Sequence, residues 1–186
     1  VPCNWELQGF GEYTYGRWYT IKGQRPSDET GIYRYKFDAP KSWAGQRVKI
    51  FFDGVMTDAE IMINGKPAGE MHQGGFYRFN YDITELLNLG KKNQLEVKVA
   101  KESANRSINA AERKADWWLF GGIYRPVWLE VLPQVHMEHF VLNADHHGKL
   151  QVAVDMAGDA KGHEIIVSVR SLKDGKTVYT SNGQTT

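Results

Sequence analysis

The chain contains 186 residues, which is enough for one complete domain and part of a second. Its 23 basic and 22 acidic residues nearly cancel, so the net charge gives no reason to expect a nucleic acid or an anionic membrane as a partner. No apolar stretch approaches the roughly 18 residues that a membrane helix needs. Cys3 is the only cysteine, which excludes an intrachain disulfide and a cluster of thiolate metal ligands.

Most of the chain shows the two-residue period of β-strands. Residues 1–31 are irregular and rich in Gly, Tyr and Trp, and the first clear alternation follows them. Short apolar–polar runs then recur, with turn residues about every 8–12 positions, a spacing typical of a sandwich or barrel. Residues 76–81 continue the same pattern. The inward positions that the alternation predicts are Tyr33, Tyr35, Phe37, Val48, Ile50, Phe52, Ile61, Ile63, Leu95, Val97 and Val99.

Two local motifs predict a hairpin and a helix. Asn64-Gly65 follows an alternating run, and both residue types tolerate the positive φ angles of a type I′ hairpin turn. Asp82 and Glu85 are spaced as a capping box, with leucines following and Gly90 as a stop. We therefore expect a tight hairpin at the first motif and a short helix after the second.

A long polar connection, residues 101–115, leads into a further predicted strand. The connection is rich in Ala and lacks a strand pattern, and connections of this length are usually functional or mobile. After it, apolar and outward residues alternate as in a strand with one buried face. The residues predicted to face inward there are Val127, Leu129 and Val131.

The stretch between the connection and this strand is the main candidate site. Within seven residues it combines a carboxylate, two indoles and two glycines, namely Asp116, Trp117, Trp118, Gly121 and Gly122. A sugar site needs a hydrogen-bond acceptor, a ring to stack on and a backbone that turns tightly. The alternative is a bulge whose tryptophans fill the sandwich, the commoner position of aromatics beside strands. The residues alone leave both interpretations open.

After Pro133 the pattern changes to a second set of strands. Strand-like runs at residues 135–143, 149–156, 163–172 and 176–180 are separated by glycine-containing turns. They predict a second sandwich over residues 134–186, about half of an immunoglobulin-like domain of roughly 100 residues. A half-sandwich has an unpaired edge and an uncovered apolar face, which native proteins avoid. We therefore expect the chain to be a fragment of a longer protein.

Several segments together resemble the N-terminal sugar-binding domain of glycoside hydrolase family 2, the β-galactosidase and β-glucuronidase group. They occur in the order of the family, and the last is the most specific: residues 1–9, 33–37, 51–55, 64–65, 74–76, 81–84 and 116–129. The resemblance implies a galactose-binding-like jelly-roll sandwich over residues 1–133. It also implies that residues 134–186 begin the immunoglobulin-like middle domain, and that a catalytic (β/α)₈ barrel lies outside this chain.

The resemblance also implies individual site residues. In β-galactosidases of the family, two side chains of this domain reach into the active site of the barrel and hydrogen-bond the terminal sugar. The matching positions are Asn64 and Asp116. Trp117 and Trp118 are further candidates, and we expect one to stack on a sugar face and the other to pack beneath the loop. Asn64 is equally explained as the first residue of a tight turn, and the two roles are compatible.

The same resemblance implies that this chain holds no catalytic residue, no metal and no cofactor. Retaining β-glycosidases use two carboxyl groups about 5–5.5 Å apart, and in this family both are glutamates of the barrel. In some relatives the residue matching Asp116 ligates a monovalent cation, but the other ligands come from the barrel. The six histidines offer no convincing set of three or four converging zinc ligands. We expect solvated carboxylates at Glu6, Glu12, Glu29 and Glu70.

Three function classes follow. The first is a non-catalytic piece of a retaining, β-galactosidase-like glycosidase that binds a terminal β-linked sugar and packs on the barrel of its own protein. The second is a free-standing carbohydrate-binding, lectin-like module, and the third is a structural sandwich. We favour the first, with a periplasmic or secreted location expected and a cytoplasmic one left open.

Overall fold

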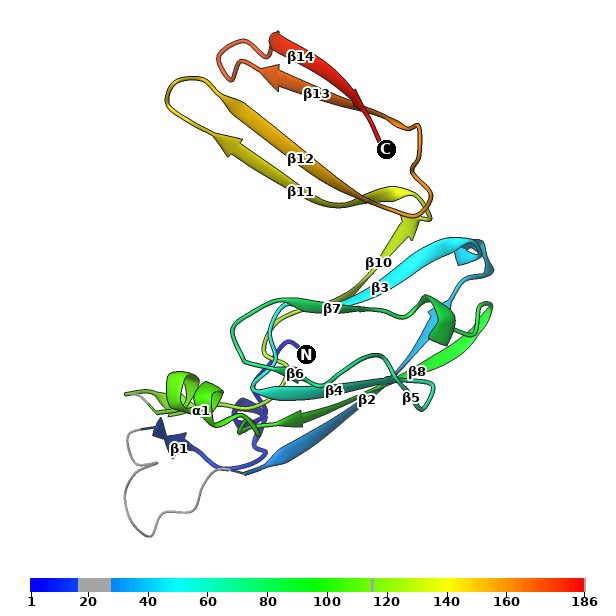
Figure 1. Cartoon of the computed structure of the whole chain (residues 1–186). Coiled ribbons are helices and arrows are strands. Elements are labelled where there is room, and N and C mark those ends of the chain that lie inside the picture. Colours follow the sequence, from blue (N-terminus) through cyan, green and yellow to red (C-terminus); the bar gives the residue numbers. More distant parts are fainter. Residues whose placement is uncertain (17–27, 115, 186) are drawn as a thin grey trace. The chain divides into compact units, whose positions relative to one another are not determined.

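A computed structural model describes residues 1–16, 28–114 and 116–185 (Figure 1). The chain divides into two compact units, Val1–Val131 and Leu132–Thr186. Strands dominate both units, so the prediction of an all-β fold is confirmed. In the part of the chain that is described, no helix combines the length and the apolar character needed to cross a membrane. Of the segment 1–31 predicted to be irregular, residues 17–27 lie outside the described residues.

The first unit contains short strands and only brief helical segments. In chain order, its elements are η1 (Glu6–Gln8), β1 (Thr14–Tyr15), β2 (Thr30–Ala39), η3 (Lys41–Trp43), β3 (Gln46–Phe52), β4 (Asp58–Ile63), β5 (Lys66–Pro67), β6 (His72–Gln73), β7 (Phe79–Asp82), η4 (Thr84–Leu86), β8 (Lys91–Ala100), α1 (Arg106–Glu112), β9 (Trp118–Leu119) and β10 (Val127–Pro133).

Two sheets of this unit form a sandwich. One has the strand order β10-β3-β7, and the other has the order β2-β8-β4-β5 with β6 also paired to β4. Figure 1 shows them as two layers. A third, two-stranded sheet consists of β1 and β9 alone. The core between the two large sheets is apolar, as the alternation predicts, and includes Val48, Ile50, Phe52, Ile61, Ile63, Val97 and Val99.

The inward positions predicted for the last strand of the first unit, β10, are confirmed as well. Val127, Leu129 and Val131 of β10 are partly buried and pack against the core. Trp128 points the other way, and its ring stacks on Phe51 with centroids 4.2 Å apart. Tyr35 differs from its expected burial, because 67% of its surface is exposed although Tyr33 and Phe37 on the same strand contact the core.

The hairpin at Asn64-Gly65 is confirmed. It joins β4 to β5, whose registered pairs include Ile63 with Lys66. Asn64 has φ of 52° and Gly65 has φ of 78°, the two positive values that a type I′ turn requires. The turn thus follows directly from the residue types at these two positions.

The capping-box motif forms less helix than predicted. It gives only the 3₁₀ turn η4, whose N-cap is Ile83 and not Asp82. The Asp82 carboxylate instead accepts hydrogen bonds from the backbone N–H and the hydroxyl of Thr84, at 3.0 and 2.5 Å. This local turn competes with a longer helix for the same backbone groups.

The connection at residues 101–115 contains a helix that the strand-based interpretation missed. Its N-cap is Asn105, whose side chain accepts a hydrogen bond of 2.9 Å from the Ser107 N–H at the start of α1. Such a cap satisfies one of the unpaired donors of a helix N-terminus. Residue 115 lies outside the described part of the chain.

The second unit consists of two antiparallel hairpins. They are formed by β11 (His136–Ala144) with β12 (Leu150–Ala157) and by β13 (Glu164–Arg170) with β14 (Thr177–Gln184), close to the predicted strand runs. Alternate residues of β12 and β13 are half-buried. Among the described residues of this unit, only Ala160 is buried. That this unit begins an immunoglobulin-like sandwich stays a prediction.

Candidate functional site

The candidate residues around Asp116 lie on the small sheet at one end of the first unit. Trp118 opens β9 and pairs in register with Tyr15 of β1. The Gly16 N–H donates a 2.8 Å hydrogen bond to the Trp117 carbonyl and extends the ladder by one residue. This pairing presents the three neighbouring side chains at the surface. Asp116 is exposed, and Trp117 and Trp118 keep 44% and 50% of their surface exposed.

The Asp116 carboxylate is oriented by a neighbouring phenol. The Tyr15 hydroxyl donates a hydrogen bond to Asp116 Oδ1 across the two strands. A carboxylate has two oxygens and about four lone-pair positions, so it can accept from a tyrosine and from sugar hydroxyls at the same time. Sequence reasoning missed Tyr15, because only the strand pairing brings it to Asp116.

Aromatic residues of β1, β9 and their neighbours form what we call the aromatic patch, comprising Tyr13, Tyr15, Trp117, Trp118 and Phe120. The Trp118 ring meets Tyr13 at 6.0 Å and Tyr15 at 5.2 Å in edge-on geometry. Tyr13 meets Phe120 edge-on at 6.0 Å. Neither tryptophan fills the sandwich. That one stacks on a sugar and the other packs beneath the loop stays a prediction. Exposed indole faces of this kind suit the apolar faces of a sugar ring.

The two glycines that follow are required by close packing. A Cβ at Gly121 would collide with the indole of Trp5, so only glycine allows this approach. Gly122 has φ of 102°, which favours glycine strongly. Its backbone pairs with Met56 through two hydrogen bonds of 3.0 and 3.1 Å. The stretch is thereby fixed to the sandwich just after the aromatic patch.

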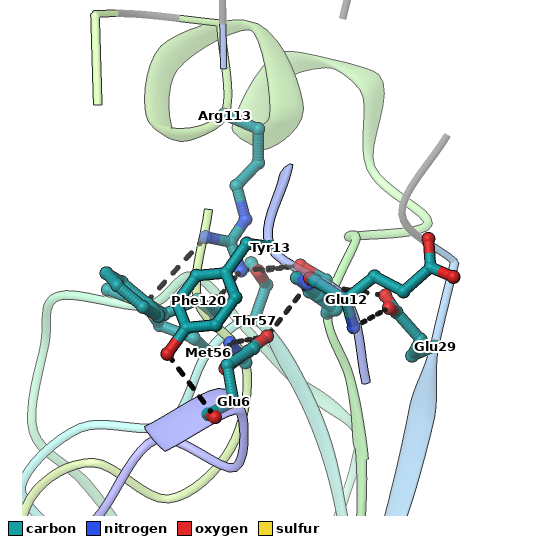
Figure 2. A network of polar contacts seen from close by, with 10 residues as sticks. Glu6, Glu12, Tyr13, Glu29, Met56, Thr57, Arg113 and Phe120 are labelled. Carbon is teal, nitrogen blue, oxygen red and sulfur yellow. Dashed lines mark hydrogen bonds and ion pairs between the residues drawn. The ribbon is translucent and has the colours of Figure 1, made fainter. Parts of the chain in front are cut away.

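A buried ionic network contacts Tyr13 and Phe120 of the patch (Figure 2). The ammonium of Lys101 lies 2.8 Å from Glu6 Oε1 and 3.4 Å from Glu29 Oε2, and it donates a 2.7 Å hydrogen bond to the Glu12 carbonyl. The side chains of Lys101 and Glu6 have no exposed surface. Both Glu6 oxygens also accept from the Gly121 N–H at 3.1 Å.

The network corrects one sequence-based expectation. Glu6 was expected to be a solvated carboxylate, but it is 3% exposed and paired with Lys101. A signal for this pairing is present in β8. Lys101 continues the inward alternation of Leu95, Val97 and Val99, so a cation at that position needs a buried carboxylate. Nothing in the residues around Glu6 identifies it as that carboxylate.

Asn64 lies at the other end of the sandwich from Asp116. Asn64 follows Ile63, the last residue of β4. Lys101 of the ionic network follows Ala100, which pairs with Asp58, the first residue of β4. Six residues at about 3.3 Å each separate the two ends by roughly 20 Å. The Asn64 amide donates to Leu86 O and Asn93 Oδ1 at 2.8 and 2.7 Å. Its oxygen accepts from Gln94 N at 2.9 Å.

Residues 1–133 of the chain match a known family model, described as the sugar-binding domain of glycosyl hydrolases family 2. The chain belongs to glycoside hydrolase family 2. Among its family 2 relatives, the β-galactosidase of Thermoanaerobacter pseudethanolicus is 34% identical over 147 residues, covering 77% of this chain and 20% of that protein. The β-galactosidase BoGH2A of Bacteroides ovatus is 28% identical over 182 residues, covering 95% and 20%.

Solved structures give the same assignment. A β-glucuronidase of Bacteroides uniformis is similar to the whole chain with a TM-score of 0.72 and 25% identity, over 22% of its own length. A β-glycosidase of Bacteroides vulgatus is similar to 98% of the chain with a TM-score of 0.71 and 26% identity, over 23% of its own length. This chain therefore spans about a fifth of the length of the family 2 proteins that it resembles.

The described residues of this family 2 chain show no arrangement for a metal. Within them, no group of three or more His, Cys, Asp or Glu side chains is placed to hold an ion. The adjacent rings of His146 and His147 lie 3.7 Å apart on an exposed turn. The side chains around Asp116 offer a hydrogen-bond acceptor and exposed aromatic rings.

Proposed function

We propose that this chain is the non-catalytic N-terminal part of a retaining, β-galactosidase-like glycosidase. In this proposal its aromatic patch and Asp116 complete the subsite for the terminal sugar on a (β/α)₈ barrel elsewhere in the protein. The chain's share of its relatives' length and the names of those relatives support this. The two catalytic carboxyl groups, about 5–5.5 Å apart in retaining enzymes, belong to that barrel.

One observation carries the assignment of the subsite. Asp116 is an exposed carboxylate that accepts a hydrogen bond from Tyr15 and stands beside the exposed rings of Trp117 and Trp118. A sugar ring offers hydroxyl donors at its edge and C–H groups on its faces. The arrangement matches both, because the carboxylate accepts from the edge while an indole covers a face. Packing of this end against the barrel would exclude water and strengthen these hydrogen bonds.

A sugar contact by Asn64 stays a prediction. It would not involve the sugar bound at Asp116, because one monosaccharide is too small to reach from one side chain to the other. The three hydrogen bonds of the Asn64 side chain, to Leu86, Asn93 and Gln94, already account for an asparagine at this position. A sugar contact at Asn64 would therefore have to serve a second sugar residue. Loss of turnover on a disaccharide but not on a nitrophenyl monosaccharide, in an Asn64→Asp variant, would reveal such a role.

The experiment that tests the subsite is Asp116→Asn in the complete protein. Each charge-assisted hydrogen bond from a sugar hydroxyl is worth roughly 1.5–3 kcal/mol, and the amide weakens it. We expect kcat/KM to fall at least about tenfold on the preferred nitrophenyl glycoside, with an unchanged thermal midpoint. An unchanged kcat/KM contradicts the assignment. Asp53→Asn changes a carboxylate that directly follows β3 and pairs with Arg78; it is the matched control and should leave kcat/KM unaffected.

The absence of a catalytic pair is tested with the chain alone. Pure protein of residues 1–186 should release no nitrophenol from a panel of α- and β-galactosides, glucosides and glucuronides. Turnover that co-purifies with the chain would mean that its own carboxylates catalyse hydrolysis. The same panel, given to the complete protein, identifies the sugar. We also propose export to the periplasm or the medium, and fractionation of the producing cells tests that location.

A further inference from the structure

The small β1–β9 sheet needs an anchor. It contains two residues per strand, and among the described residues it forms no ladder with either sheet of the sandwich. An isolated two-stranded hairpin is marginally stable in water. Yet this sheet carries Tyr15 and Trp118, and Asp116 lies two residues before β9. Something other than strand pairing must therefore hold the candidate subsite in place.

One buried cation holds the β1 side. Lys101 donates to the carbonyl of Glu12, two residues before β1 begins, at 2.7 Å. Glu29 accepts from the backbone N–H of the same residue at 2.9 Å and lies 3.4 Å from the ammonium. Tyr13, next in the chain, donates its hydroxyl to the Glu6 carbonyl at 3.4 Å. The segment entering β1 is thus bound on both its N–H and its C=O side (Figure 2).

A second buried cation holds the β9 side. Arg113 is 2% exposed, and its Nη2 donates to the carbonyl of Phe120, the residue directly after β9, at 2.9 Å. The same nitrogen donates to the carbonyl of Lys101 at 2.5 Å, and Thr57 Oγ1 donates to that carbonyl at 2.7 Å. Because β1 and β9 are antiparallel, Glu12 and Phe120 lie at the same end of the ladder. Both cations hold that end.

The chemistry of these contacts indicates that they orient the backbone and do not merely fill the core. Taking a charge out of water is costly, and apolar residues of similar volume are often as stabilising as a buried ion pair. Hydrogen bonds from charged donors, however, fix the direction of the groups they meet. Here the acceptors are the main-chain carbonyls of Glu12 and Phe120, which flank one end of the β1–β9 ladder. The two cations are also joined, since Arg113 donates to the backbone of Lys101.

We propose that Arg113 and Lys101 are positioning residues for Asp116. They act through the carbonyls of Phe120 and Glu12 and set the height and angle of the β1–β9 sheet over the sandwich. Neither touches the sugar, because both side chains are buried. This inference rests on the proposed role of Asp116 and adds the residues that keep its carboxylate at the correct distance from the barrel.

A double-mutant cycle in the complete protein tests the inference. Arg113→Lys keeps the charge but loses the rigid guanidinium plane that places Nη2 between two carbonyls. We expect it to lower kcat/KM roughly tenfold, since small misplacements of a contacting group are costly. In the Asp116→Asn background the same change should lower kcat/KM less than about twofold, because the group being positioned is already lost. A merely structural arginine would give the same fold-loss in both backgrounds.

The outcomes separate the two proposals. If Asp116→Asn alone has no effect, the proposed sugar contact fails, and positioning toward it fails with it. If Asp116→Asn is impaired but Arg113→Lys is silent, or if their losses multiply, only positioning is overturned. Ile61→Val is the matched control, since it trims the buried core of β4 and should lower the thermal midpoint without changing kcat/KM. Should Arg113→Lys fail to fold, Glu6→Gln replaces it in the cycle. If neither folds, the network serves the sandwich and the inference is wrong.

Discussion

His72 is a half-buried histidine on β6, near the end of the sandwich that carries the candidate site. Its ring stacks on Phe79 with centroids 3.6 Å apart, and its Nε2 lies 2.9 Å from the Gly74 carbonyl. Burial lowers the pKa of His72 below its usual value of 6.5, although the Gly74 carbonyl and the charges of Asp58 and Glu112 act in the opposite direction. The imidazole is therefore neutral in the folded protein at neutral pH.

This shift predicts a loss of stability in mild acid. Below pH 6.5 the unfolded chain binds a proton at His72 that the folded protein resists, so the free energy of unfolding falls until the lower folded pKa is passed. Urea unfolding at about pH 7.5 and about pH 5.5 should show a larger loss for the natural chain than for His72→Gln. Equal losses in the two proteins would mean that other groups cause the acid sensitivity.

Single residues also mark what the sequence can reveal about the site. The inward position of Lys101 follows from the alternation of β8 and calls for a buried anion. That Glu6 provides it could not be derived, because the two residues are far apart in the chain and meet only through the fold. The contact between Tyr15 and Asp116 could not be predicted from the sequence for the same reason. Contacts across the fold are set by tertiary pairing, which local patterns do not encode.

At the scale of elements, the strands were the most predictable part. Val48, Ile50 and Phe52 alternate and are all buried in β3, because a strand with one covered face fixes which residues point inward. The hairpin at Asn64-Gly65 was equally clear, since few residues accept its backbone angles. The residue types within each of these elements were sufficient to predict its structure.

The helical elements were less predictable because competing local hydrogen bonds are close in energy. Asp82 and Glu85 fit a capping box, yet Asp82 bonds Thr84 and the helix shortens to one 3₁₀ turn. In the connection at 101–115, an Asn105 cap and good helix formers suffice for α1. That helix ends at Glu112, and its C-cap residue, Arg113, joins the network. An element of seven residues thus helps to position the candidate subsite.

At the scale of the whole molecule, the two units differ sharply in their cores. Among its described residues, the first encloses a cluster of twelve buried residues, which come from both sheets and from the loops beside them. In the second, the described residues include only one buried position, Ala160, while large apolar side chains such as Phe140 and Ile166 remain 64% and 60% exposed. Buried apolar area is the main source of folding free energy, so stability must be concentrated in the first unit.

This difference predicts how the two parts behave when they are separated. A chain of residues 1–133 should unfold cooperatively, with a thermal midpoint close to that of the whole chain. A chain of residues 134–186 should lose its structure without a sharp transition, because two hairpins with one uncovered apolar face do not offset the entropy of ordering them. Far- and near-ultraviolet circular dichroism during heating would measure the transition of each of the two chains. A cooperative transition in the shorter chain would show that hairpin pairing alone stabilises it, and would place part of the stability outside the sandwich core.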